Sequence, residues 1–334
     1  MADFYQTPTL FTLSNICFDE NKVFSHFFTQ PVVIVIPCHF RHLENKAVFN
    51  LLNELKPINY ITEIIVVVNG QVHPSDDVTY VLKSLDKKCT ILYESSGNKP
   101  GKGLALCLGF SYLYKKYKNK AIVATLDADL KNFTPTLLLK LIYPMQTLKA
   151  DFNKGYYTRY SDKKLDGRLT RLLIFPLLQA LLLQKKNDEL LLFLTEFRYP
   201  LSGDVAFKSH LIPQLDLASN WSYDLSLLVS VHKNKSCLNL FQTEITQNYQ
   251  HPHRDLNHAS DFGLMEVARD IIAYLLNTFP VDTELLAKNY ELSGQCFVNK
   301  YEKLALFNNL FFSKKNEEQL IALIISEILS HSIA

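Results

Sequence analysis

The chain has 334 residues, 48% of them hydrophobic and 20% charged, and its formal net charge is +2. This length predicts one large or two medium domains with a sizeable core, and the near-neutral charge excludes a protein that binds nucleic acid mainly through charge. The six cysteines are scattered without a CxxC pair. We interpret them as reduced thiols of an intracellular protein, neither a disulfide framework nor a zinc site.

Two stretches bear on secretion and membranes. The N-terminal MADFYQTPTLFTL has an early Asp3 and no basic start before an apolar core, so it is a poor signal peptide and a cytoplasmic location is expected. The most apolar stretch, 172–194, is interrupted by Pro176, Gln179 and a polar QKKNDE block. It lacks an unbroken run of roughly 20 apolar residues. Two core or interface helices joined by a polar turn are predicted, with contact at a membrane surface as the lesser alternative.

The first half of the chain alternates strand and helix patterns. Continuous β-branched runs predict buried strands, and apolar residues at helical spacing predict the helices between them. This order predicts an α/β fold with an open, mostly parallel, Rossmann-like sheet covered by helices. The expected strands span 31–37, 63–70, 89–95 and 121–129, and the expected helices span 43–55, 76–85 and 101–117.

The second half has a less regular pattern that ends in helices. We expect an N-terminal segment 1–30, a catalytic domain 31–260 and a helical C-terminal extension 261–334. The expected elements are a helix over 134–148, an extended segment 150–159, a helix over 167–182, a turn with a short helix over 199–215, a strand-like run 237–250, and helices from Phe262 onward with a loop near 279–283.

Polar residues follow the expected strands where each one ends. Ligands of open parallel sheets bind at the carboxyl ends of the strands, so these residues should line one crevice. They are Cys38 and His39, Asn69 and Gly70, Ser95 and Ser96, and Asp127 and Asp129.

The DAD segment at 127–129 is the strongest candidate site in that crevice. Side chains alternate along an extended segment, so Asp127 and Asp129 should share a face. Two adjacent carboxylates repel unless a cation lies between them, and Mg²⁺ often binds one or two carboxylates together with phosphate oxygens. The alternative is an exposed strand end with solvated acids.

Three further motifs have residues suited to anions or metals. The loop 95–103, SSGNKPGKG, offers Lys99 and Lys102 at a helix start that favours phosphate, although it matches neither the P-loop nor the dinucleotide pattern. GRLTR at 167–171 opens a helix with two arginines and a hydroxyl, which suits an anion. HPHRD at 251–255 clusters histidines that could bind metal or phosphate. Each has a structural alternative: an ordinary connecting loop, a capped helix, or structural histidines.

Taken together, the strand ending in Pro37, the VNG strand end, the GKG loop, DAD and the distal histidine resemble the GT-A glycosyltransferases. The succession GRLT, PLSGD, HPHRD resembles the retaining glucosyl-3-phosphoglycerate synthases, which are related to the mannosylglycerate synthases. The resemblance covers roughly residues 31–270. It implies transfer of a hexose, with UDP-glucose as the favoured donor, to a small acidic acceptor such as 3-phosphoglycerate or glycerate, with Mg²⁺ or Mn²⁺ as cofactor.

The resemblance also implies roles for individual residues. Asp129 and His253 would be the metal ligands, and Asp127 would lie beside the ribose or the water shell of the metal. Asp204 and Asp224 would hold sugar hydroxyls. The nucleotide-sugar contacts would come from Pro37, Cys38, His39, Asn69, Gly70, Lys102 and Gly203, and the acceptor contacts from Gly167, Arg168, Leu169, Thr170 and Asp255.

The sequence departs from the family pattern at several positions. Arg41 lies where an acidic residue is usual, Val68 where an aspartate is common, and His251 where an arginine is usual. Asp255 replaces an asparagine near the acceptor phosphate, which a carboxylate would repel. These departures bear on base recognition and on whether 3-phosphoglycerate itself is the acceptor.

The resemblance implies front-face attack in which the acceptor hydroxyl loses its proton to the departing phosphate. One alternative is an inverting transferase acting on a polysaccharide or lipid-phosphate, with Asp204 or Asp224 as base. Another is a nucleotide-sugar-binding protein without catalysis. A homodimer through the apolar helices is one interpretation, and burial of those helices within one chain is the other.

Overall fold

The computed structural model describes residues 10–16, 28–40, 46–69, 88–94, 101–161, 163–250 and 263–331. Its contacts divide the chain into two compact units, Met1–Tyr157 with Ser202–Pro252, and Thr158–Leu201 with His253–Ala334. The predicted division into 1–30, 31–260 and 261–334 stays a prediction. The predicted helix 76–85, Gly70, the loop residues 95–100 and the motif HPHRD lie outside the described residues.

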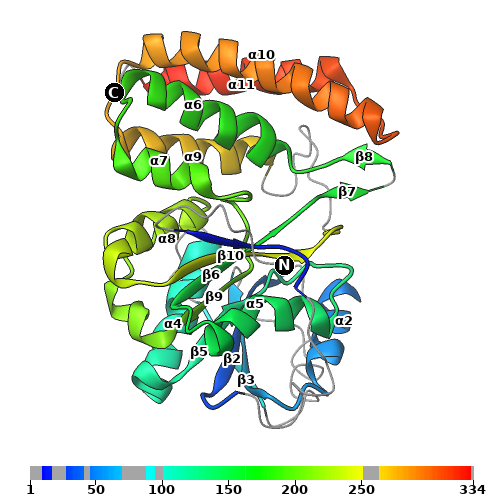
Figure 1. The fold of residues 1–334 in the computed structure, drawn as a ribbon, viewed down its shortest axis with the longest axis vertical. Coiled ribbons are helices and arrows are strands. Elements are labelled where there is room, and N and C mark those ends of the chain that lie inside the picture. Colours follow the sequence, from blue (N-terminus) through cyan, green and yellow to red (C-terminus); the bar gives the residue numbers. More distant parts are fainter. Residues whose placement is uncertain are drawn as a thin grey trace. The chain divides into compact units, whose positions relative to one another are not determined.

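The first unit is built on a mixed sheet (Figure 1). Among the described residues its eight strands run in the order β1-β10-β6-β9-β5-β2-β3-β4. All neighbouring pairs are parallel except the two made by β9, which runs antiparallel to β5 and β6. The strands are β1 Phe11–Leu13, β2 Val32–His39, β3 Ile61–Asn69, β4 Cys89–Tyr93, β5 Ile122–Thr125, β6 Phe152–Tyr157, β9 Val205–Lys208 and β10 Leu240–Thr246.

The predicted parallel core is confirmed by β2, β3, β4 and β5. Val32 to Ile36 are fully buried, as expected for a strand covered on both faces. The strand β9 was not predicted, because VAFK is short and follows a turn-like PLSGD. Its pairing with β5 places the end of the PLSGD segment beside the end of the DAD strand, since Thr125 lies opposite Val205.

The described part of the first unit also contains helices α2 Lys46–Leu55, α4 Lys102–Tyr117, α5 Pro135–Thr147 and α8 Tyr223–His232, with 3₁₀ turns at Lys118–Lys120, Ser209–Gln214 and Lys235–Cys237. Thr134 caps α5 by accepting a hydrogen bond from the Leu137 amide, and Pro135 occupies its first position. Helix α4 packs against β2 and β3 at Gly109. A Cβ there would lie 2.7 Å from Cγ1 of Val35, so this close approach requires glycine.

Where the structure describes it, the second unit consists mainly of helices, together with the hairpin of β7 Tyr160–Ser161 and β8 Lys164–Leu165. Its helices are the π-helical turn η3 Leu169–Ile174, α6 Phe175–Gln184, α7 Glu189–Glu196, α9 Leu264–Thr278, α10 Thr283–Phe307 and α11 Lys314–Ser330. Helix α10 packs against α6 and α11 (Figure 1). The polar break predicted within 172–194 is confirmed: Asp188 caps α7 by accepting from the amides of Leu190 and Leu191, both at 3.0 Å. Among the described helices, none has the length and apolar character needed to cross a membrane.

Candidate active site

The DAD segment lies just beyond the end of β5. The strand ends at Thr125, and the chain then turns, so Asp127 and Asp129 flank the buried Ala128 in a turn. The prediction that strand alternation places both carboxylates on one face is therefore wrong, because the strand ends before them. Both acids nevertheless lie at the carboxyl end of a central strand and are partly exposed to solvent.

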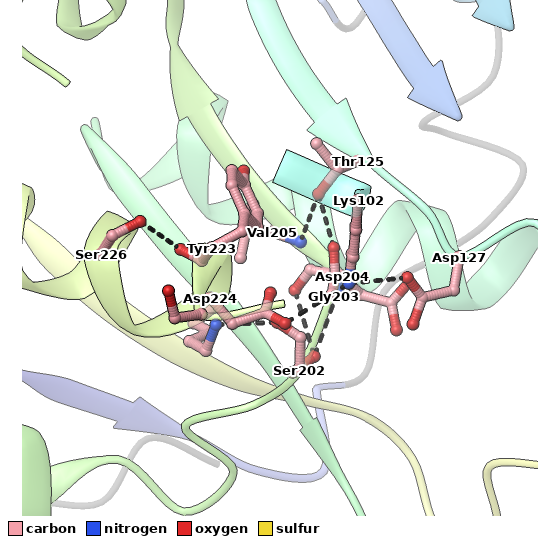
Figure 2. Close-up of polar contacts among 12 residues, drawn as sticks. Lys102, Thr125, Asp127, Ser202, Gly203, Asp204, Val205, Tyr223, Asp224 and Ser226 are labelled. Atoms are coloured by element: carbon pink, nitrogen blue, oxygen red, sulfur yellow. Dashed lines mark hydrogen bonds and ion pairs between the residues drawn. The ribbon is translucent and has the colours of Figure 1, made fainter. Parts of the chain in front are cut away.

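A buried hydroxyl joins the DAD strand to the PLSGD turn. Thr125 Oγ1 donates a hydrogen bond to the Gly203 carbonyl at 2.6 Å and accepts one from the Val205 amide at 3.3 Å. Figure 2 shows these two contacts beside the charged groups. The two acidic segments, which are about 75 residues apart in sequence, are thus held together by backbone contacts at the pairing of β5 with β9.

Lys102, at the first position of α4, lies between two acidic residues (Figure 2). Its Nζ is 3.0 Å from Asp127 Oδ1 and 3.4 Å from Asp224 Oδ2. Burial by itself would lower the pKa of Lys102, but the charges of Asp127 and Asp224 outweigh burial and raise it. The predicted lysine of the GKG loop is therefore a fixed cation at this site, where it neutralises the first acid of DAD.

Asp204 is completely buried, in line with a role inside the site rather than on its rim. Burial, followed by the negative charge of Asp127, raises the pKa of Asp204 from 3.8 to about 7. The Tyr249 hydroxyl faces this carboxylate and opposes the rise. Both carboxylate oxygens of Asp204 are buried, and the Tyr249 hydroxyl and the Asp127 backbone are hydrogen-bonding groups that favour its charged form.

Asp224 lies in the first turn of α8 and is also buried. Burial raises its pKa, although the charges of Lys102 and Lys154 counteract the rise. Its Oδ1 has no hydrogen-bond partner among the described residues, while Oδ2 faces Lys102. The structure thus brings Lys102, Asp127, Asp204 and Asp224 together, while the roles that the family resemblance implies for them stay predictions.

Lys154 is a member of this cluster that the sequence analysis missed. It lies on β6, is 1% exposed, and donates from Nζ to the Ser202 carbonyl at 2.8 Å. Burial lowers its pKa to about 8. The available signal was a lysine inside FNKGYY, a strand whose six residues are all buried, because a fully buried lysine is rare unless it has a partner.

Gly203 lies directly against the Lys102–Asp127 ion pair. An added Cβ at this position would overlap both Asp127 Oδ1 and Lys102 Nζ. The glycine of PLSGD therefore lets the turn approach the charged pair closely, and a side chain there would displace the ends of Asp127 and Lys102.

The start of α4 packs against residues 218–219, and one of its amides is already used within the protein. The Leu104 amide donates to the Ser219 carbonyl at 2.8 Å, and an added Cβ at Gly101 or Gly103 would overlap the carbonyls of Ser219 and Ala218 respectively. The two glycines of GKG are explained by packing of the helix start against 218–219. The Leu104 amide is therefore not free to bind a phosphate, because it already donates to the Ser219 carbonyl.

The ends of β2 and β3 adjoin the DAD turn, as the crevice prediction requires. Strand β2 pairs with both β5 and β3, so Cys38 and His39 end beside Asn69. Asn69 Nδ2 donates to the Gly101 carbonyl at 2.9 Å, which ties the end of β3 to the start of α4. Burial, together with the nearby charge of Asp129, raises the pKa of the Cys38 thiol to about 12, and this places Asp129 on the β2 side of the crevice.

The described residues include only part of the predicted set of metal ligands. His253 and Asp255 lie outside them, and among the residues that the structure does describe no group of three or more His, Cys, Asp and Glu side chains could hold a metal ion. Asp127 and Asp129 are nevertheless partly exposed carboxylates at one strand end, and such hard oxygen donors fit Mg²⁺ or Mn²⁺.

The predicted acceptor residues belong to the second unit. We call residues 166–170 the acceptor loop. Gly167 has a φ of 72°, a left-handed conformation that favours glycine, and Thr170 is buried in η3. Arg171, which the sequence suggested as an anion ligand, is buried and paired with Glu317 at 3.1 Å. That prediction is wrong for Arg171, because its charge is used inside the protein.

Comparison with known proteins defines the class of protein. The family model described as glycosyl transferase family 2 matches residues 33–199. The chain is a glycosyltransferase. It belongs to glycosyl transferase family 2.

The similar proteins and solved structures share one more specific name. The chain is 26% identical to the glucosyl-3-phosphoglycerate synthase of Persephonella marina over 98% of its length and 89% of that protein, and 24% identical to that of Methanococcoides burtonii over 95% and 85%. Its fold resembles the Mycobacterium tuberculosis glucosyl-3-phosphoglycerate synthase solved with Mn²⁺ and UDP-glucose (TM-score 0.63, 21% identity, 81% of this chain and 87% of that one). It likewise resembles the complex with Mn²⁺, UDP and phosphoglyceric acid (TM-score 0.62, 21% identity, 81% and 86%). The predicted GT-A fold is confirmed.

Proposed function

We propose that this chain is a metal-dependent, retaining glycosyltransferase that moves glucose from UDP-glucose to a small acidic acceptor such as 3-phosphoglycerate or glycerate. The observation that carries the proposal is the buried cluster in which Lys102 bridges Asp127 and Asp224 above Asp204. The similar proteins named glucosyl-3-phosphoglycerate synthase, and the solved complexes with UDP-glucose and phosphoglyceric acid, support this donor and acceptor class.

Asp129 would hold Mg²⁺ or Mn²⁺, with His253 as the second protein ligand. The solved relatives contain Mn²⁺ or Mg²⁺ with UDP, which supports the same cofactors here. When bound, the metal would neutralise negative charge that builds on the departing diphosphate. Lys102 keeps Asp127 fixed and partly neutralised, so Asp127 can contact the ribose or metal-bound water from a set position.

The donor sugar would be held by the buried acids. Asp224 Oδ1 has no hydrogen-bond partner among the described residues, and sugar hydroxyls are suitable donors to it and to the Asp204 carboxylate. Pro37, Cys38, His39 and Asn69 would contact the nucleoside at the ends of β2 and β3, together with Gly70. Gly203 leaves room for the Lys102–Asp127 pair beside the sugar.

The acceptor would be held by the acceptor loop and Asp255. Gly167, Arg168, Leu169 and Thr170 offer backbone amides, a guanidinium and a hydroxyl to an anionic group. The acceptor hydroxyl would attack the sugar carbon from the face of the departing phosphate and pass its proton to that phosphate. The chain's contribution is then positioning of the two substrates.

An inverting transferase is the second candidate, and one observation favours it. The pKa of Asp204 is raised to about 7, where a carboxylate can act as general base near neutral pH. A protein that binds the nucleotide-sugar without transfer is the third. A homodimer and a cytoplasmic location stay predictions.

One experiment separates these functions. The protein is incubated with UDP-glucose, Mn²⁺ and 3-phosphoglycerate or glycerate, and the product is analysed by proton NMR, with an EDTA-treated sample as the metal-free control. An α-linked glucosyl product that requires metal supports the proposal, and a β-linked product supports the inverting alternative. Calorimetric binding of UDP with Mn²⁺ but neither transfer nor donor hydrolysis would support the binding protein. UDP- and GDP-sugars are compared by thermal stabilisation to identify the donor.

A further inference from the structure

The π-helical turn η3 leaves a backbone acceptor that the C-terminal helices satisfy. The Phe175 amide bonds to the Thr170 carbonyl, five residues back, which is the π-helical pattern. Pro176 lacks an N–H, so in an α-helix the Leu172 carbonyl would lose its donor. The Tyr290 hydroxyl on α10 donates to this carbonyl at 2.5 Å instead. The irregular start of this helix is thus stabilised from outside, by α10.

Arg171 connects the same turn to the segment before the acceptor loop. Its Nε donates to the Asp166 carbonyl at 2.8 Å and its guanidinium to the Leu165 carbonyl at 3.4 Å. The Arg171 amide bonds to the Gly167 carbonyl at 3.1 Å. The Arg171 side chain therefore fixes the backbone conformation of Leu165 and Asp166, immediately before the left-handed Gly167.

Glu317 on α11 neutralises and orients that guanidinium. Arg171 is 5% exposed and Glu317 is 7% exposed, and the ion pair between them is 3.1 Å long. The Arg171 guanidinium also lies 4.9 Å from the ring centre of Tyr301 on α10. Arg171 is thus held on one side by two helices and on the other by carbonyls of the loop entry. A buried guanidinium without its carboxylate would not keep this geometry.

We infer that Glu317 is a positioning residue for the acceptor loop: it fixes Arg171, and Arg171 fixes the backbone of residues 165–167, which leads directly into Arg168 and Thr170. The inference rests on the proposed function, in which this loop grips the anionic acceptor. It assigns a task to the helical C-terminal extension, which completes the acceptor loop without itself contacting the acceptor.

The test compares two glutamates on α11. Glu317→Gln keeps the shape but removes the buried charge. Glu327→Gln is the matched control on α11, because Glu327 pairs with the exposed Arg269 on α9. For each variant, KM for the acceptor, KM for the donor and kcat are measured, and hydrogen exchange is followed in peptides covering 163–170. A double variant, Arg171→Met with Glu317→Leu, removes both charges and retains a foldable core if the single variant fails to fold.

We expect Glu317→Gln to raise the acceptor KM about tenfold while the donor KM stays within about twofold, since only acceptor positioning is affected. Exchange in 163–170 should accelerate in Glu317→Gln and in the double variant, but not in Glu327→Gln. Equal increases of both KM values, or unchanged exchange in 163–170, would overturn the inference. If the wild-type protein transfers no glucose to either acceptor, the proposed function fails, while the exchange measurement still decides whether Glu317 orders the loop.

Discussion

Lys102 Nζ lies 3.0 Å from Asp127 Oδ1, so the first acid of DAD is paired with a cation supplied by α4. The same ammonium lies 3.4 Å from Asp224 Oδ2. Removing it would take a positive charge from between Asp127 and Asp224, beside the buried Asp204, and the repulsion among these carboxylates would disturb the proposed donor site.

Lys102→Met should therefore lower kcat/KM by about 10²–10³-fold, the effect typical of removing a preorganised electrostatic group. The control is Lys208→Met, which removes a lysine from another partly buried pair, with Asp151, in the same unit. Transfer assays on both variants, with circular dichroism to verify folding, check the prediction. Equal activity losses in the two would show that Lys102 is structural only.

Gly203→Ala should damage the same ion pair from the opposite side. The added methyl group would overlap Asp127 Oδ1 and Lys102 Nζ, so one of them must move. We expect a loss of activity similar to that of Lys102→Met, and little further loss when the two changes are combined, because they disturb one interaction. Gly263→Ala is the control, since an added Cβ there meets no described atom within 4 Å. Additive losses in the double variant would contradict this interpretation.

Asp129→Asn should abolish metal-dependent donor binding. The amide keeps the size of the side chain but removes the negative charge that a divalent cation requires. Calorimetry with UDP and Mn²⁺ should show no binding in Asp129→Asn, while Asp216→Asn, at a side chain that is 87% exposed, should bind like the wild type. EDTA should reduce the wild type to the level of Asp129→Asn. Full Mn²⁺-dependent binding in Asp129→Asn would exclude Asp129 as a metal ligand.

The buried Asp204 predicts a pH dependence of stability. Its pKa is raised from 3.8 to about 7 in the folded protein, so between these values the folded state binds more protons than the unfolded state. The unfolding free energy therefore falls as pH rises from about 4 to about 7. Each pKa unit is worth about 1.4 kcal/mol, so the decrease should amount to a few kcal/mol. Urea unfolding of EDTA-treated protein at several pH values should show this decrease in the wild type and a smaller one in Asp204→Asn. Parallel pH profiles would contradict the assignment.

Tyr290→Phe should destabilise the second unit. It removes the donor to the Leu172 carbonyl, which Pro176 cannot replace, and an unsatisfied buried carbonyl costs about 1–3 kcal/mol. Tyr160→Phe, at an exposed tyrosine of the same unit, is the control. Urea unfolding followed by circular dichroism measures both variants. A change below about 0.5 kcal/mol in Tyr290→Phe would show that water or another group satisfies the carbonyl.

The parallel strands and most helices could be predicted because their signals are local. A β-branched run such as 32–36 indicates a buried strand whatever surrounds it, and Asp188 and Thr134 cap helices through their own neighbours. Strand β9 could not be predicted in the same way, because four residues carry little periodicity and its partners β5 and β6 are distant in sequence.

The candidate site was predictable in its members but not in its contacts. The sequence alone, through strand ends and the family resemblance, predicted that Asp127, Asp129, Asp204 and Asp224 belong near a sugar nucleotide, and their roles stay a prediction. Only the tertiary structure decided that Lys102 bridges two of them, that Lys154 is buried behind the PLSGD turn, and that Arg171 pairs with Glu317. The physical reason is that a local sequence pattern shows where a charged residue lies along the chain. The oppositely charged or polar partner that offsets the cost of burying it lies in a distant segment and comes close only on folding.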